Sequence, residues 1–216
     1  MPDKRRRAPD GARARQITIG ITGASGAAYA TRTIAALLEK GVNLELVFSD
    51  FGRRLLKDEL GAAASVDRLG EYLRGRYGDG VANAEFVVHS NKDLGATIAS
   101  GSHHSSGMVV VPCSMKSLAG IAHGLSRNLV ERAADVMLKE KRPLIIVPRE
   151  TPMSLPQLKN MVLAAEAGAM IMPAMPAFYQ MPKTLDDLAD FMAGKILAAL
   201  GIEHELYPEW KPNDEN

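Results

Sequence analysis

The 216-residue chain is poor in the side chains that form disulfides and metal sites. Its one cysteine, Cys113, excludes a disulfide within the chain and leaves no cysteine cluster for zinc. The five histidines show no HExxH spacing, and the neighbouring pair His103 and His104 is more typical of a polar loop than of a metal site. We therefore expect no metal site, and a reducing environment.

Long apolar runs are also lacking. No run reaches the length of a transmembrane helix, and the N-terminus has no apolar signal-peptide core, so we expect a cytoplasmic protein without a membrane partner. Residues 1–15 are rich in lysine and arginine but nearly devoid of apolar side chains, which predicts a disordered basic tail and gives no support for nucleic-acid binding. The remaining composition fits one domain, residues 16–203, followed by a C-terminal tail, residues 204–216.

A glycine-rich turn follows the first β-branched run. Residues 16–21 predict a strand and residues 27–40 a helix, and the turn between them holds Gly23, Ser25 and Gly26. Glycine lets the backbone approach a ligand closely, and the free N–H groups at a helix start bind anions. The pattern favours a nucleotide-phosphate site over a turn that serves packing alone.

The same pattern recurs after residues 108–112, an apolar run that enters the segment 113–117 and then a helix. Another apolar run, residues 143–148, ends at Arg149. Further strands are predicted at 43–48, 84–89 and 169–172, and helices lie between them. This alternation predicts an α/β fold, a single-domain Rossmann-like (flavodoxin-like) three-layer sandwich with a mainly parallel sheet. Ligands of such sheets bind at the carboxyl ends of the strands, so Ser25, Ser49, Ser114 and Arg149 should share one edge.

Three other segments leave their role open on composition. The hydroxyl-rich residues 100–107 suit either a plain connection or a polar cradle. Arg132 and Lys139 are seven residues apart and share one helix face, which by itself indicates a solvated basic surface. A last helix begins at a capping box of Thr184 and Asp187, and Lys195 borders its apolar stripe.

Taken in order, segments 21–26, 100–102, 111–118, 131–140, 143–152 and 176–179 resemble the flavin prenyltransferases of the UbiX family. The resemblance covers residues 16–210 and implies a metal-independent prenyltransferase. Such an enzyme transfers the dimethylallyl group of dimethylallyl phosphate to N5 and C6 of reduced FMN. The product, prenylated FMN, passes to a UbiD-type decarboxylase, as in ubiquinone biosynthesis. The family's assembly, a homo-oligomer of twelve chains, is implied too.

The resemblance also implies site residues. Ser25 and Glu59 resemble the family's acid–base pair, and Lys139 and Glu150 are further catalytic residues. Lys195 stands where arginine also occurs, which keeps the charge but loses the bidentate geometry. Tyr179 and Lys195 would come from a neighbouring subunit. The implied FMN site comprises Gly23, Ala24, Ser25, Ser49, Ser114, Met115, Lys116, Ser117, Arg132 and Arg149, and the donor site comprises Ser100, Lys139, Arg149, Glu150, Tyr179, Lys195 and Trp210.

Three other functions compete with this one. A short-chain NAD(P) oxidoreductase would use Tyr179 and Lys183 on one helix face, but Pro182 between them argues against a helix there. An FMN-dependent cysteine decarboxylase commonly has a histidine near the first glycine turn, and none is present here. A flavin-binding storage or interaction protein, without enzymatic activity, would leave Lys139, Glu59 and Tyr179 unexplained.

Overall fold

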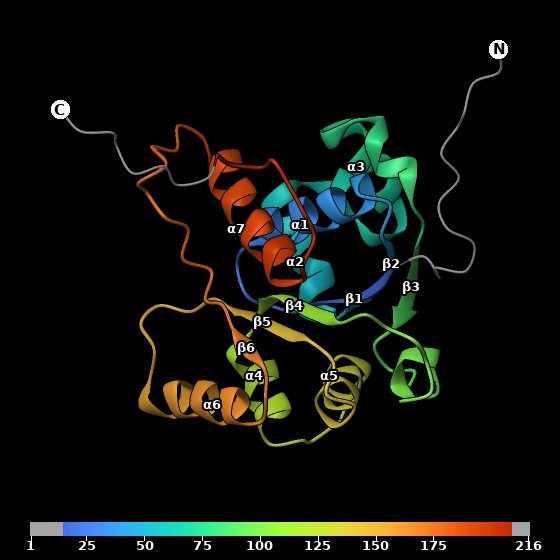
Figure 1. Cartoon of the computed structure of the whole chain (residues 1–216), viewed down its shortest axis with the longest axis vertical. Helices are drawn as coiled ribbons and strands as arrows, with labels where there is room; N and C mark the ends of the chain where they lie inside the picture. The colour runs from blue at the N-terminus through green and yellow to red at the C-terminus, as the bar shows by residue number, and fades with distance from the viewer. Residues whose placement is uncertain (1–14, 209–216) are drawn as a thin grey trace, which may run out of the picture.

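A computed structural model describes residues 15–208, and in it six parallel strands form one sheet (Figure 1). The order is β3-β2-β1-β4-β5-β6, which is the order of a doubly wound Rossmann sheet, so the predicted fold class is confirmed. The order reverses between β1 and β4, and ligands of such sheets bind in the crevice outside the carboxyl ends of these strands. The strands are β1 (Gln16–Ile21), β2 (Asn43–Phe48), β3 (Phe86–Ser90), β4 (Met108–Cys113), β5 (Leu144–Pro148) and β6 (Met170–Ile171).

Helices cover both faces of the sheet, as Figure 1 shows. One face carries α1 (Ala27–Glu39), α2 (Asp50–Leu60), α3 (Leu69–Tyr77) and α7 (Leu185–Ala199). The other carries α4 (Met115–Ala122), α5 (Leu129–Lys139) and α6 (Leu155–Glu166). Short 3-10 turns are η1 (Ala62–Ala64), η2 (Val66–Arg68), η3 (Asp79–Asn83) and η4 (Thr97–Ala99).

Each face of the sheet has its own apolar core. Ile17, Ile19 and Ile21 of β1 point into the core beneath α1, while Val109 and Val110 of β4 point into opposite cores. Side chains of a strand alternate between its two faces, and a strand covered on both faces is apolar throughout. This is why β4 appears in the sequence as an uninterrupted apolar run, with every residue buried.

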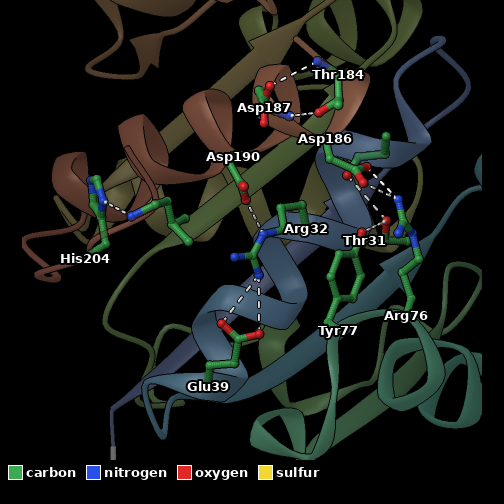
Figure 2. A network of polar contacts seen from close by, with 12 residues as sticks. Thr31, Arg32, Glu39, Arg76, Tyr77, Thr184, Asp186, Asp187, Asp190 and His204 are labelled. Carbon is green, nitrogen blue, oxygen red and sulfur yellow. Dashed lines mark hydrogen bonds and ion pairs between the residues drawn. The ribbon is translucent and has the colours of Figure 1, made fainter. Parts of the chain in front are cut away.

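Ion pairs tie α7 to α1 and to α3 (Figure 2). The Arg32 guanidinium on α1 donates to Asp190 on α7, and it also lies 3.3 Å from a carboxylate oxygen of Glu39. Arg76 on α3 donates to Asp186 on α7 at 2.6 Å. Because the Arg32 side chain is only 15% exposed, its pairing holds two helices together inside the protein and not on its surface.

Hydrogen bonds fix the chain at both ends of α7. The predicted capping box of α7 is confirmed: the Asp187 N–H donates to the Thr184 hydroxyl at 3.1 Å, and the Thr184 N–H donates to the Asp187 carboxylate at 3.0 Å. The Arg15 guanidinium donates to the Gly201 carbonyl at 3.2 Å, beyond the end of α7.

Within residues 15–208, no helix is long and apolar enough to cross a membrane. Residues 1–14 of the predicted basic tail, and Trp210, lie outside the described residues.

Candidate functional site

The turns after β1 and β4 meet at the switch point of the sheet. The Ser114 N–H donates to the Thr22 hydroxyl at 2.7 Å, and that hydroxyl donates to the Pro112 carbonyl at 3.0 Å. Arg149, just after β5, donates from Nε to the Ser25 carbonyl at 3.1 Å. The structure therefore brings Ser25, Ser114 and Arg149 to one edge of the sheet. Sequence reasoning missed the role of Thr22, although a hydroxyl directly after a buried strand is a signal for such a link.

The start of α2 docks tightly against this turn. Ser49 caps α2 by accepting the Gly52 N–H at 3.0 Å. A Cβ on Gly52 would lie 2.3 Å from the Ile21 carbonyl oxygen, and a Cβ on Gly23 would lie 2.4 Å from Cβ of Phe51. Both positions therefore need glycine for the close approach. The Phe51 ring remains 70% exposed and gives the edge an apolar surface beside its hydroxyls.

Glu59 reaches back from α2 to the first glycine turn. Its carboxylate accepts the Gly26 N–H at 3.0 Å and the Ala27 N–H at 2.8 Å, and these are the first N–H groups of α1. Burial raises the pKa of Tyr29, and the negative charge of Glu59 raises it further. From the sequence without the resemblance, Glu59 would be a surface carboxylate. In the structure it occupies the N–H groups that were expected to bind a phosphate.

The start of α4 offers a second set of anion-binding groups. The Ser114 hydroxyl accepts the Ser117 N–H at 3.2 Å and donates to the Ser117 hydroxyl at 3.1 Å. The first N–H groups of a helix have no partner within the helix, and here the exposed Lys116 lies beside them. Met115 is 8% exposed and packs into the core, so only its backbone can contact a ligand. This turn therefore presents hydroxyls, N–H groups and one cation.

A separate cluster forms around residues 100–107, which we call the hydroxyl loop. The Ser100 and Ser102 hydroxyls lie 2.8 Å apart. Lys139 donates to Glu140 at 2.6 Å and thereby holds the pKa of that carboxyl below its usual value. A Cβ on Gly101 would lie 2.8 Å from the Lys139 ammonium nitrogen, so glycine lets this loop pass close to the two charged groups.

Lys139 and Arg149 lie at opposite ends of the strands: Lys139 is at the amino ends, which we call the amino edge of the sheet, and Arg149 is at the carboxyl ends, the carboxyl edge. Lys139 ends α5 shortly before β5 begins at Leu144, whereas Arg149 directly follows the end of β5. A strand of this length spans roughly 17–20 Å. The two cations were predicted to hold the same phosphate, and one chain does not bring them together. That prediction can hold only if two copies of the chain complete one site.

Two other predicted site residues, Arg132 and Glu150, have hydrogen-bond partners within the chain. Arg132 donates to the Ala99 carbonyl at 3.0 Å and to Asp135 at 2.7 Å, so its guanidinium already holds the start of the hydroxyl loop. Glu150 accepts the Thr151 N–H at 3.0 Å, beside Arg149.

Tyr179 and Lys195 both lie against Phe191 of α7. The two rings of Tyr179 and Phe191 are 6.1 Å apart, and the Lys195 ammonium lies 6.0 Å from the Phe191 ring. Tyr179 and Lys183 do not share a helix, which removes the geometry that a short-chain oxidoreductase needs.

A Rossmann sheet whose switch point carries hydroxyls, free helix N–H groups and an arginine defines a nucleotide-binding α/β protein. The family model described as Flavoprotein matches residues 5–197. A curated relative, flavin prenyltransferase UbiX of Halalkalibacterium halodurans, is 48% identical over 199 residues, which are 92% of this chain and 95% of the relative. The chain belongs to the Flavoprotein family and, within it, to the UbiX flavin prenyltransferases.

Solved structures agree with this assignment. A crystal structure of AnUbiX (PadA1) in complex with FMN and dimethylallyl pyrophosphate superposes with a TM-score of 0.82 at 37% identity, covering 93% of this chain and 99% of that chain. A dodecameric FMN-dependent UbiX-like decarboxylase from Escherichia coli O157:H7 superposes with a TM-score of 0.80 at 38% identity, covering 91% and 100%. The resemblance in the sequence motifs is thus confirmed.

Proposed function

We propose that this flavin prenyltransferase transfers the dimethylallyl group of dimethylallyl phosphate to N5 and C6 of reduced FMN, and that a UbiD-type decarboxylase uses the product. The observation that carries the proposal is that Ser25, Ser114 and Arg149 lie together at the carboxyl edge of the sheet. The Glu59 carboxylate accepts hydrogen bonds from the same turn. Reduced FMN, when bound, supplies the nucleophilic atoms of this reaction. The protein binds and orients the two substrates and transfers protons.

The FMN phosphate fits the start of α4 better than the start of α1. At α1 the carboxylate of Glu59 already accepts two N–H groups and would repel a second anion. At α4 the hydroxyls of Ser114 and Ser117 lie at the start of the helix, and the exposed Lys116 is in its first turn. With the phosphate there, Glu59 and Ser25 face the other end of the flavin, where a carboxylate can accept the proton that ring closure releases.

The leaving phosphate of the donor needs cations and hydroxyls. Fixed donors directed at developing charge are worth about 10²–10³ in rate for one lost contact. In one chain, Lys139 and Ser100 offer such groups at the amino edge of the sheet, and Arg149 offers one at the carboxyl edge. We infer that the donor phosphate binds between two copies, with Lys139 of one chain facing Arg149 of another.

Exposed apolar side chains support this self-association. Four of them lie on α6, where Ala164 is the one buried residue, and others surround Tyr179. A dodecameric relative is consistent with the assembly that we propose here. The α6 set is Leu155, Leu158, Val162 and Leu163, and the Tyr179 set is Met175, Phe178, Met181 and Leu185.

The test is anaerobic incubation of the protein with reduced FMN and dimethylallyl phosphate, followed by mass spectrometry of the released flavin. We expect a flavin heavier by one dimethylallyl group, together with free phosphate. Unmodified FMN and unconsumed donor would contradict the proposal. A parallel incubation with FMN and a peptide ending in cysteine tests the competing decarboxylase, which would release carbon dioxide instead.

A further inference from the structure

A buried carboxylate lies in the middle of β2. Glu45 is 5% exposed and shares its face of the strand with Val47, which packs into the core beneath α5. A carboxylate buried here is costly unless it is hydrogen-bonded, and an apolar side chain would fill a parallel strand at lower cost. The stability of the sheet therefore does not explain this residue.

The partners of Glu45 come from three different segments. His103 of the hydroxyl loop lies with Nε2 at 2.8 Å from one carboxylate oxygen. His89 of β3 lies at 3.3 Å from the other, and the Thr97 hydroxyl of η4 donates to that oxygen at 3.4 Å. Each imidazole is placed to donate a ring N–H to this carboxylate. Glu45 thus links β2 to the loop that carries Ser100 and to the turn before it.

Two arginines hold the same loop through its backbone carbonyls. Arg142 donates to the carbonyls of Gly101 and His103, each at 2.7 Å, and Arg132 donates to the Ala99 carbonyl at 3.0 Å. The loop is therefore held by hydrogen bonds to Glu45 and to two arginines, and Gly101, between the two serines, passes beside Lys139. Hydrogen bonds to charged groups are the stronger ones, and such groups can lock a loop in the geometry that a ligand requires.

We propose that Glu45 is a positioning residue for the prenyl-donor phosphate: through His103 it fixes the hydroxyl loop so that the Ser100 and Ser102 hydroxyls stand beside Lys139. The inference deepens the proposed function and rests on it. Glu45 touches neither substrate. Its effect should fall on binding of the donor, and binding of FMN at the other edge of the sheet should not change.

The experiment compares three variants of the full-length protein. His103→Leu removes the donor to Glu45, His103→Gln restores a neutral donor, and His104→Leu changes the exposed neighbouring histidine, which serves as the matched control. We expect His103→Leu to raise the KM for dimethylallyl phosphate by about tenfold, because a hydrogen bond to a buried charge is lost, with kcat and FMN affinity unchanged. His103→Gln should recover most of this loss, and His104→Leu should equal the parent.

A second readout does not depend on activity. Hydrogen exchange of residues 99–104, measured with and without inorganic phosphate, should be faster in His103→Leu than in the parent and His104→Leu. Glu45→Gln, which keeps the side-chain volume, should show the same change and replaces His103→Leu if that variant does not fold. Parent-like KM and loop exchange in His103→Leu would overturn the inference, as would an equal loss of FMN affinity. A parent that does not prenylate FMN would overturn the proposed function, whereas the loop exchange would still decide this inference.

Discussion

A site shared between two chains predicts that two inactive variants can restore activity to each other. Lys139→Ala removes a cation at the amino ends of the strands, and Glu59→Gln removes the proposed acid–base group at their carboxyl ends. Each variant alone should lose activity, by about 10²–10³ for the cation and about 10²–10⁴ for the acid–base group. FMN should still bind to the Lys139→Ala variant, because the proposed flavin contacts lie at the other edge.

Mixed assemblies of the two variants should recover a defined fraction of the parent activity. If each site takes Lys139 from one chain and Glu59 from another, half of the chains supply an intact group on each side. Random co-assembly from equal co-expression should then leave about one quarter of the sites with both groups, and activity should return to about one quarter of the parent value. Groups that act within a single chain would give no recovery, because no chain in the mixture carries both.

The assay uses two affinity tags and sequential purification, so that only assemblies containing both variants are measured. Co-expression of Lys139→Ala with the double variant Lys139→Ala/Glu59→Gln is the matched control, and it should show no recovery. Recovery in this control would reveal contamination by the parent. Mixed assemblies that remain as inactive as their components would refute the division of the site between chains.

Three further predictions follow from described contacts. Arg32→Ala leaves the half-buried Asp190 unpaired and should lower the free energy of unfolding by about 1–3 kcal/mol in thermal denaturation, whereas Arg54→Ala, whose pair is exposed, should change it by under about 0.5 kcal/mol. Burial raises the pKa of the Cys113 thiol to about 12, so a thiol reagent at pH 8 should label the unfolded but not the native protein, and native labelling would contradict the burial. Ser25→Asp adds a charged side chain at the turn where the uncharged flavin ring is proposed to bind; because the bound ring would remove water from this charge, FMN binding should weaken in a fluorescence titration, and unchanged affinity would place the flavin elsewhere.

The fold was predictable because its signals are local. Short apolar runs such as residues 108–112 and 143–148 have no polar face, which is typical of strands buried on both sides. Boundaries were less certain where backbone geometry changes within an element. The segment 66–76, for example, begins as the 3-10 turn η2 and continues as the helix α3 from Leu69.

The site was predictable only in part. Contacts between side chains that are distant in the sequence form only in the folded protein. The residues after β1, β4 and β5 were placed on one edge by topology alone. The partners of Glu59 and of Glu45 lie far away in sequence, 33 residues for Gly26 and 58 for His103, so neither contact leaves a local pattern. The position of Lys139 before β5 does indicate the amino ends of the strands, whereas the family resemblance assigns Lys139 and Arg149 to one phosphate site without saying which chain supplies each.

The carboxylate of Glu59 at the start of α1 has a consequence for selectivity. Any small anion that diffuses to the first glycine turn meets a negative charge that already occupies the Gly26 and Ala27 N–H groups. Free sulfate, inorganic phosphate and citrate are therefore disfavoured at this turn, whereas an uncharged ring that stacks against Phe51 is not. The protein thus supplies its own carboxylate in place of a free anion at the start of α1, which suits the proposed binding of the uncharged part of a nucleotide at this turn.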